Sequence, residues 1–213
     1  MEIFTGIQGE SSFAGLPCTF IRLHGCNLNC VWCDTVYARQ TGNYTEIDMN
    51  DALQKCSGSG TDLTEITGGE PLLEPETPDL CSGLLNAGQT VLVETNGSRD
   101  LAVLPEKTIK IVDYKLPGSG EYGSFLSRNF KHITRDDEMK FVVSDRADFQ
   151  CALSVITAEH LVEKTTLLFS PVSKRVTPAE LACWILDAGI QARLTLQLHK
   201  IIWNDRDEEK RFC

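Results

Sequence analysis

The sequence predicts an α/β fold with a mainly parallel sheet, either an open doubly wound sheet or a complete or partial barrel. Short apolar runs rich in β-branched residues alternate along the chain with segments of helical periodicity. No repeat or low-complexity tract interrupts them. A polar or glycine-rich turn follows almost every run. Such alternation predicts parallel strands, because each helix returns the chain to the same end of the sheet.

The predicted elements follow from this pattern. Strands are predicted for residues 18–25, 63–67, 90–95, 109–114, 139–143, 166–170 and 193–199. Amphipathic helices are predicted for residues 45–56, 77–88 and 177–189. The last helix carries explicit end signals, with Thr177 as N-cap, Pro178 in the first turn, Glu180 three residues after the cap and Gly189 as terminator.

Composition limits the class of protein. With 213 residues and 42% hydrophobic content, the chain is expected to form one domain spanning residues 1–213. No apolar run approaches the roughly 20 residues that span a bilayer, and the N-terminus does not resemble a signal peptide, so a cytoplasmic location and no membrane partner are expected. A formal charge of -10 argues against nucleic acid as a partner and favours a small-molecule substrate.

Three of the nine cysteines are clustered, namely Cys26, Cys30 and Cys33, in a C-x3-C-x2-C run. One interpretation is a zinc site completed by a distant cysteine or by His24. However, structural zinc sites usually combine two paired-cysteine turns, and no second pair is present. Thiolates also bind cubane iron-sulfur clusters, in which three cysteines would leave one iron open to another ligand.

The polar turns that follow the predicted strands belong to the same edge of the sheet. They include TGGEP (67–71), ETNG (94–97) and DYKLPGSG (113–120). The cysteine run also follows a strand, and loops at the carboxyl ends of parallel strands converge on one crevice. Arg22 lies on an otherwise apolar strand, where a guanidinium requires an anionic partner. The sequence therefore predicts one site at this edge.

These motifs resemble those of a known enzyme class. CNLNCVWCD (26–34) resembles the cysteine motif of radical S-adenosylmethionine enzymes, and GGEP (68–71) resembles their segment that binds the methionine amino group. More narrowly, the N-terminal residues 2–35 and the segments ITGGEPLL, ETNGS, DEMKFVVSD and LQLHKIIW resemble the 7-carboxy-7-deazaguanine synthase family. The resemblance extends from residue 2 to about residue 205. It implies a partial, modified (β/α) barrel of the radical SAM type with mainly parallel strands.

The resemblance also implies a reaction. The three cysteines would hold a 4Fe-4S cluster, whose fourth iron takes the amino and carboxylate groups of S-adenosylmethionine. One-electron reduction would give a 5'-deoxyadenosyl radical that takes a hydrogen from C6 of 6-carboxy-5,6,7,8-tetrahydropterin. Ring contraction with loss of ammonia would give 7-carboxy-7-deazaguanine, a carbon-nitrogen lyase reaction of queuosine biosynthesis. An external reductant of the flavodoxin or ferredoxin type and a homodimer are further expectations.

The same resemblance implies roles for individual residues. Thr35 resembles a ligand of Mg2+, a hard cation that prefers oxygen. Arg22, Thr67 and His199 resemble residues that contact the substrate at the reacting centre. The other implied substrate contacts are Ile7, Gln8, Gly9 and Glu10. The implied S-adenosylmethionine contacts are Gly68, Gly69, Glu70, Asn96 and Ser119.

The sequence departs from the family pattern at a few positions. Ser11 stands where the family has a glycine, and Gly118 stands where a serine is common. The charged C-terminal segment 204–213 differs from the compact ending expected of the family. Three alternative functions are a glycyl-radical-enzyme activase acting on a protein partner, a radical tRNA-modifying enzyme and a non-catalytic zinc module. The IQGE segment, Thr35 and the terminal LHKIIW segment are not explained by the activase role.

Overall fold

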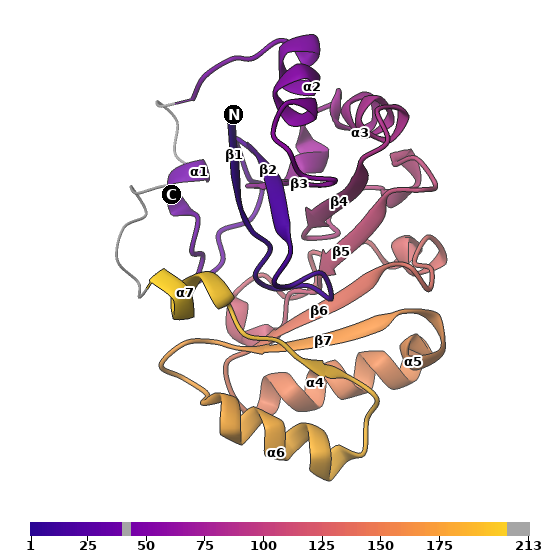
Figure 1. Cartoon of the computed structure of the whole chain (residues 1–213). Helices are drawn as coiled ribbons and strands as arrows, with labels where there is room; N and C mark the ends of the chain where they lie inside the picture. Colours follow the sequence, from indigo (N-terminus) through magenta and orange to yellow (C-terminus); the bar gives the residue numbers. More distant parts are fainter. Residues whose placement is uncertain (40–43, 204–213) are drawn as a thin grey trace.

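The computed structural model describes residues 1–39 and 44–203 (Figure 1). The prediction about the charged C-terminal segment therefore lies outside the described residues. No helix among the described residues is both long enough and apolar enough to cross a bilayer.

One sheet of eight strands forms the centre of the fold (Figure 1). The strands are β1 (Glu2–Ile7), β2 (Pro17–Leu23), β3 (Leu63–Gly68), β4 (Thr90–Thr95), β5 (Ile109–Asp113), β6 (Glu138–Val143), β7 (Thr166–Pro171) and β8 (Arg193–Leu194). Their spatial order is their order along the chain, and only β1 runs antiparallel to its neighbour. A doubly wound sheet would reverse its strand order at a switch point. Since no pairing joins β1 to β8 within residues 1–39 and 44–203, the sheet is a partial barrel, as predicted.

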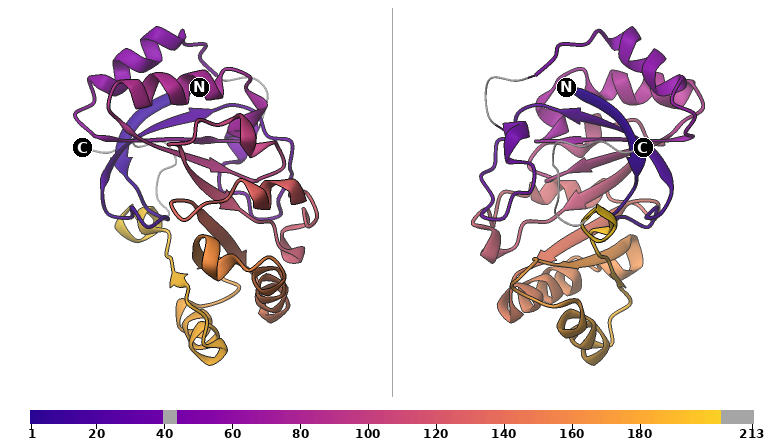
Figure 2. Two further views of the ribbon diagram at one scale, coloured as in Figure 1. Left: turned by 90° about the vertical axis from the view of Figure 1, so that its right-hand side faces the viewer. Right: turned by 60° about the vertical axis from the view of Figure 1, so that its left-hand side comes forward.

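The longer helices cover the outside of this curved sheet (Figure 2). The helices are α1 (Val36–Arg39), α2 (Met49–Ser57), α3 (Thr77–Asn86), α4 (Arg146–Ala158), α5 (Leu161–Lys164), α6 (Pro178–Ala188) and α7 (Leu198–Trp203). Short 3-10 turns span Pro71–Leu73, Leu101–Val103, Pro117–Ser119 and Ser127–Lys131. Two buried clusters join the layers, one between α2, α3 and the first parallel strands and one between α4, α6 and β5 to β7.

The sequence signals at α6 are confirmed. The Thr177 hydroxyl accepts a hydrogen bond from the backbone N–H of Glu180, and the Glu180 carboxylate accepts one from the backbone N–H of Thr177, which completes a capping box. Gly189 ends the helix in the left-handed conformation, with φ 60°.

The predicted strand 193–199 is wrong over most of its length. Strand β8 contains only Arg193–Leu194, and residue 199 lies in helix α7. Thr195 still donates its backbone N–H to the carbonyl of Phe169, but Leu198 donates to the carbonyl of Gly9 instead of to the sheet. Alternation of apolar residues is a local pattern and does not show where a chain leaves a sheet. After Thr195 the chain leaves the sheet edge and crosses toward the end of β1.

The inner face of the partial barrel is layered. Its lower part is closed by a small apolar cluster of Cys18, Leu63, Leu92 and Ile111 from β2 to β5. Because side chains alternate along a strand, residues two positions further along point to the same interior. Those positions on β3, β4 and β5 are Glu65, Glu94 and Asp113. The interior therefore changes from apolar to charged toward the carboxyl ends of the strands.

Candidate active site

A cavity of about 530 Å³ opens at the carboxyl ends of the parallel strands. Its size lies within the range of small-molecule sites. Its walls come from β1 to β7, the cysteine loop after β2, and α7. Most of the residues predicted from the sequence line it: Ile7, Gln8, Gly9, Glu10, Arg22, Cys26, Cys30, Cys33, Thr35, Thr67, Gly68, Gly69, Asn96 and His199. Glu70 and Ser119 lie outside the lining.

The cysteine loop presents three free thiols to this cavity, those of Cys26, Cys30 and Cys33. Burial raises the pKa of the Cys26 and Cys30 thiols, whereas the nearby Lys115 ammonium acts in the opposite direction. The loop is fixed at its centre, where Val31 donates its backbone N–H to the carbonyl of Ser119. None of the other cysteines among the described residues lines the cavity. Three thiols without a fourth fit a cluster that leaves one iron open.

The glycines of the TGGEP turn allow the end of β3 to pack directly on the cysteine loop. Gly69 donates its N–H to Leu23 at 3.2 Å, and Glu70 donates to the carbonyl of Gly25 at 2.8 Å. A Cβ on Gly69 would lie 1.9 Å from the Gly25 carbonyl oxygen, and one on Gly68 would lie 2.1 Å from that of Leu23. Gly68 also has φ +133°, which disfavours other residues. The turn therefore sets the position of the thiols.

The side chains of Glu70 and Ser119 are engaged in the protein itself. Glu70 accepts hydrogen bonds from the Thr95 hydroxyl at 2.7 Å and from the backbone N–H groups of Leu72 and Asn96. Burial raises the pKa of this carboxyl, and the bonds to its carboxylate form act in the opposite direction. The Ser119 hydroxyl donates to the carbonyl of Leu116 at 2.6 Å. Their contact with S-adenosylmethionine stays a prediction, and in this structure both side chains fix neighbouring turns.

Arg22 presents its guanidinium to the cavity between two aromatic rings. The centroids of Phe4 and Tyr37 lie 5.7 and 5.8 Å from its central carbon. Its Nε is buried and has no hydrogen-bond partner among the described residues, and the nearest carboxylate oxygen, on Glu2, is 3.8 Å away. A guanidinium held in this way can bind a carboxylate of a ligand.

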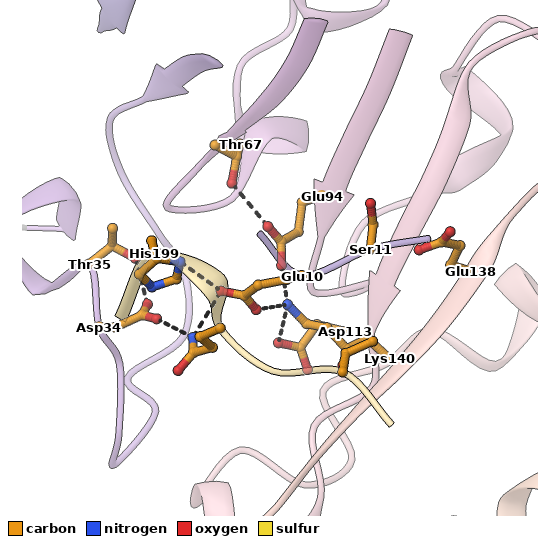
Figure 3. Close-up of polar contacts among 12 residues, drawn as sticks. Glu10, Ser11, Asp34, Thr35, Thr67, Glu94, Asp113, Glu138, Lys140 and His199 are labelled. Atoms are coloured by element: carbon orange, nitrogen blue, oxygen red, sulfur yellow. Dashed lines mark hydrogen bonds and ion pairs between the residues drawn. The ribbon is translucent and has the colours of Figure 1, made fainter. Parts of the chain in front are cut away.

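Helix α7 closes one side of the cavity through a polar cluster (Figure 3). The Gln197 amide donates to Glu10 at 2.8 Å and to Asp34 at 3.0 Å. His199 Nδ1 lies 3.9 Å from a Glu10 oxygen, and the Thr35 hydroxyl lies 3.2 Å from an Asp34 oxygen. One ligand atom each from Glu10, Asp34 and His199 lies within 4.8 Å of the others. This cluster joins the cysteine loop, the segment after β1 and the C-terminal helix.

A charged floor, defined here as Glu65, Glu94, Asp113 and Lys140, lies beneath these groups. The Lys140 ammonium contacts Glu94, Glu10 at 3.1 Å and Asp113 at 4.0 Å (Figure 3). Burial alone would lower the pKa of Lys140, but these three carboxylates raise it well above its ordinary value. Lys140 therefore remains charged and holds the carboxylates in place.

Sequence reasoning gave no individual role to Glu65, Asp113 or Lys140, and it placed Glu94 at the site only as part of the ETNG turn. The signal was present, because Glu65 and Lys140 are charged residues inside apolar strand segments, as Arg22 is. Burial of such groups is costly unless they are paired.

Two departures from the family pattern have structural explanations. A Cβ on Gly118 would lie 2.2 Å from the Ser144 hydroxyl oxygen and 2.5 Å from an Asp148 oxygen, so a serine does not fit at this position. Asp148 accepts the N–H of Gly118 at 2.8 Å. Ser11 is buried and does not line the cavity. Its N–H donates to the Gln8 side chain, so it supports the turn rather than a ligand.

Comparison with known proteins agrees with this site. Residues 20–118, which include the cysteine loop and the TGGEP turn, match the Radical SAM superfamily. The protein from Koribacter versatilis named 7-carboxy-7-deazaguanine synthase is 43% identical, covering 95% of each chain. That of Chlorobaculum tepidum with the same name is 39% identical, covering 95% of this chain and 93% of its own. The crystal structure of QueE from Escherichia coli has a TM-score of 0.75 at 24% identity, covering 92% of each chain, and shows the same fold.

The family follows from these identities, because they extend over nearly the whole of both chains and include the cysteine loop. The chain belongs to the 7-carboxy-7-deazaguanine synthase family of radical S-adenosylmethionine enzymes.

Proposed function

We propose that this chain converts 6-carboxy-5,6,7,8-tetrahydropterin to 7-carboxy-7-deazaguanine with loss of ammonia, a carbon-nitrogen lyase step of queuosine and 7-deazapurine biosynthesis. The observation that carries the proposal is the composition of the cavity. Three free thiols share its wall with a guanidinium, Arg22, and with the polar cluster of α7. A small substrate that carries a carboxylate matches this combination.

The iron-sulfur chemistry fits the residues present. Cys26, Cys30 and Cys33 would hold the 4Fe-4S cluster, which supplies the electron that cleaves S-adenosylmethionine to a carbon-centred radical. The cavity wall formed by Gly68, Gly69 and Asn96 lies beside these thiols and would contact S-adenosylmethionine. The Asn96 amide Nδ2 is 4.0 Å from Cys26 Sγ.

The substrate would lie between the cysteine loop and α7. In this position Arg22 binds its carboxylate, because the guanidinium faces the cavity between two rings that restrict its movement. Ile7, Gln8, Gly9 and Glu10 line the cavity. The backbone of the first three would contact the edge of the substrate ring, and Glu10 would accept hydrogen bonds from ring N–H groups. Thr67 and His199 line the same space.

Magnesium would bind at Thr35. This hydroxyl lies next to the Asp34 carboxylate at the cavity mouth, and Mg2+ prefers such oxygen ligands together with an oxygen of the substrate. Asp34 already accepts a hydrogen bond from Gln197 and lies 3.9 Å from the Lys200 ammonium, so the ion would bind through Thr35, water and the substrate carboxylate rather than in a closed protein cage.

Several further expectations accompany this function. They are one radical SAM domain over residues 1–213, a flavodoxin-type or ferredoxin-type reductant, a homodimer and a cytoplasmic location. A glycyl-radical-enzyme activase is not favoured, because the relatives that match almost the whole chain carry the synthase name.

An anaerobic assay tests the proposal. Cluster-reconstituted protein receives S-adenosylmethionine, reductant and 6-carboxy-5,6,7,8-tetrahydropterin, and the products are separated by liquid chromatography. We expect 7-carboxy-7-deazaguanine from the unmodified chain and none from Cys30→Ala. Accumulation of 5'-deoxyadenosine without the deazaguanine would support the radical class and contradict this substrate. Zinc without iron in oxygen-free preparations would contradict both.

A further inference from the structure

Glu65 is a buried carboxyl group that lines the cavity and has no role in the proposed function so far. It lies on β3, and the residue is 2% exposed to solvent. One oxygen, Oε2, accepts a hydrogen bond from the Gln8 amide Nε2 at 3.0 Å. The other oxygen, Oε1, has no hydrogen-bond partner among the described residues. Since Oε1 is not one of the fully buried partnerless atoms of the described residues and Glu65 lines the cavity, this oxygen is open to a ligand.

The surroundings of Glu65 favour its neutral form. The charged and titratable groups that face it are Glu94 on β4, Lys140 on β6, Glu10 after β1 and the Cys18 thiol on β2. Lys140 acts in the opposite direction, but its ammonium contacts three other carboxylates, and Glu65 forms no ion pair among the described residues. Burial raises the pKa of Glu65 to about 8, and Glu94 acts in the same direction. Because Oε2 accepts from Gln8, the proton belongs on Oε1.

This proton makes Glu65 a hydrogen-bond donor that is free to meet a ligand, whereas the donor of the charged floor, Lys140, is engaged by carboxylates. Glu94 and Asp113 only accept when ionised. The Lys140 ammonium is shared among its carboxylate partners. The Gln8 amide is also engaged, because its nitrogen donates to Glu65 and its oxygen accepts from two backbone N–H groups of the turn that follows β1. The fused pyrimidinone ring of the proposed substrate presents N–H groups, from which carboxylates can accept hydrogen bonds. It also presents one carbonyl oxygen, which needs a hydrogen-bond donor.

We propose that Glu65 is a substrate-contacting residue whose Oε1–H donates to the carbonyl oxygen of the bound pyrimidinone ring. This inference rests on the proposed function and deepens it, because it adds a specificity-determining contact on β3. A ring with an amino group in place of that carbonyl would meet a donor opposite a donor, so it would be rejected.

Binding measurements without turnover test the proposal. Cluster-loaded protein with S-adenosylmethionine and no reductant is titrated calorimetrically with 7-carboxy-7-deazaguanine, which carries the same pyrimidinone ring. At about pH 7, Glu65→Leu should bind about tenfold more weakly than the unmodified chain, because one buried hydrogen bond is lost. Glu65→Gln, which keeps a neutral donor, should bind within about twofold.

The pH profile separates a proton donor from a packing residue. Affinity of the unmodified chain should fall as the pH rises through about 8, where Glu65 ionises, whereas Glu65→Gln should lack this fall. A protonated-carboxyl band in the infrared spectrum should disappear in Glu65→Gln. Thr64→Val is the matched control, since Thr64 is buried on the same strand, donates to Gln89 at 2.9 Å and does not line the cavity.

Each outcome decides between the proposals. Unchanged affinity in Glu65→Leu, or an unchanged pH profile in Glu65→Gln, would overturn the role of Glu65 and leave the proposed function in place. Affinity lost to the same degree in Thr64→Val would also overturn it, because the effect would then be one of strand packing. Absence of binding by the unmodified chain would overturn the proposed function and this inference together.

Discussion

Replacement of Lys140 by methionine tests whether the charged floor positions the carboxylates of the site. The Lys140 side chain is 4% exposed, and its ammonium contacts Glu94, Glu10 and Asp113. Removal of one member of a buried ion pair typically costs about 3–5 kcal/mol. The partner side chains are 14–26% exposed, so water partly screens them, and we expect a loss near the lower end, about 3 kcal/mol. For a chain of this length that corresponds to a decrease in Tm of about 6–12 °C.

The pH dependence of this loss has a defined sign. The pKa of Lys140 is raised in the folded protein, so its stabilisation is complete below the unfolded lysine pKa of about 10.4 and is lost only above that value. The deficit of Lys140→Met should therefore be constant across neutral pH. It should shrink in acid, where the carboxylates left without their cation become protonated. Chemical unfolding of anaerobically purified protein is followed by circular dichroism at neutral and at acidic pH. It measures the difference in unfolding free energy between Lys140→Met and the unmodified chain at each pH.

Lys110→Met provides the matched control. Lys110 is also buried, lies 3.0 Å from Asp137 and does not line the cavity. We expect a similar loss of stability in this variant but unchanged affinity for 7-carboxy-7-deazaguanine. Lys140→Met should lose stability and also at least tenfold in affinity, because Glu10 and Glu94 are no longer held toward the ligand. If both variants bind this compound equally well, the charged floor stabilises the fold but does not position the carboxylates for the ligand.

Three further predictions concern the cofactors. Cys30→Ala should lose the bound iron and the brown absorbance, whereas Cys81→Ala, which alters a core cysteine, should keep both; iron analysis and visible spectra distinguish them. Gly69→Ala should load little iron, because its Cβ would lie 1.9 Å from a carbonyl oxygen, whereas Gly58→Ala, with its nearest contact at 3.4 Å, should load normally. Chelation of Mg2+ should slow turnover without loss of cluster absorbance, and Thr35→Ala should show little further response to added Mg2+; an equal response in this variant would exclude Thr35 as a ligand.

The sequence was sufficient for most of the fold because the relevant signals are local. Each parallel strand through β7 was recognised from an apolar run, and α6 from its capping residues. The segment 193–199 was misassigned because alternation does not reveal whether a neighbouring strand is present. Beyond Leu194 the backbone binds Phe169 once more and then turns to Gly9. That contact depends on the curvature of the whole sheet.

The site was predicted well where a motif determines the backbone and less well where strands must be aligned. The cysteine loop and Arg22 reach the cavity as expected. Glu70 does not, since its carboxylate caps the next turn, and a sequence does not indicate toward which side a residue after a glycine pair points. Lys140 and Glu94 lie 46 positions apart along the chain, and only the register of the intervening strand brings them together.

The register of β3 to β6 also explains why the carboxyl groups of the charged floor differ in their surroundings. Asp113 lies 4.0 Å from the Lys140 ammonium and has a second cation in Lys115 at 2.8 Å, so it does not depend on Lys140 alone. Glu94 lies one strand further from β6 and reaches Lys140 directly. Glu65 lies one strand further still, where only an amide is available. The carboxyl group that lies farthest from Lys140 is thus the one that keeps its proton. The same type of side chain therefore supplies the cavity with both hydrogen-bond acceptors and a hydrogen-bond donor.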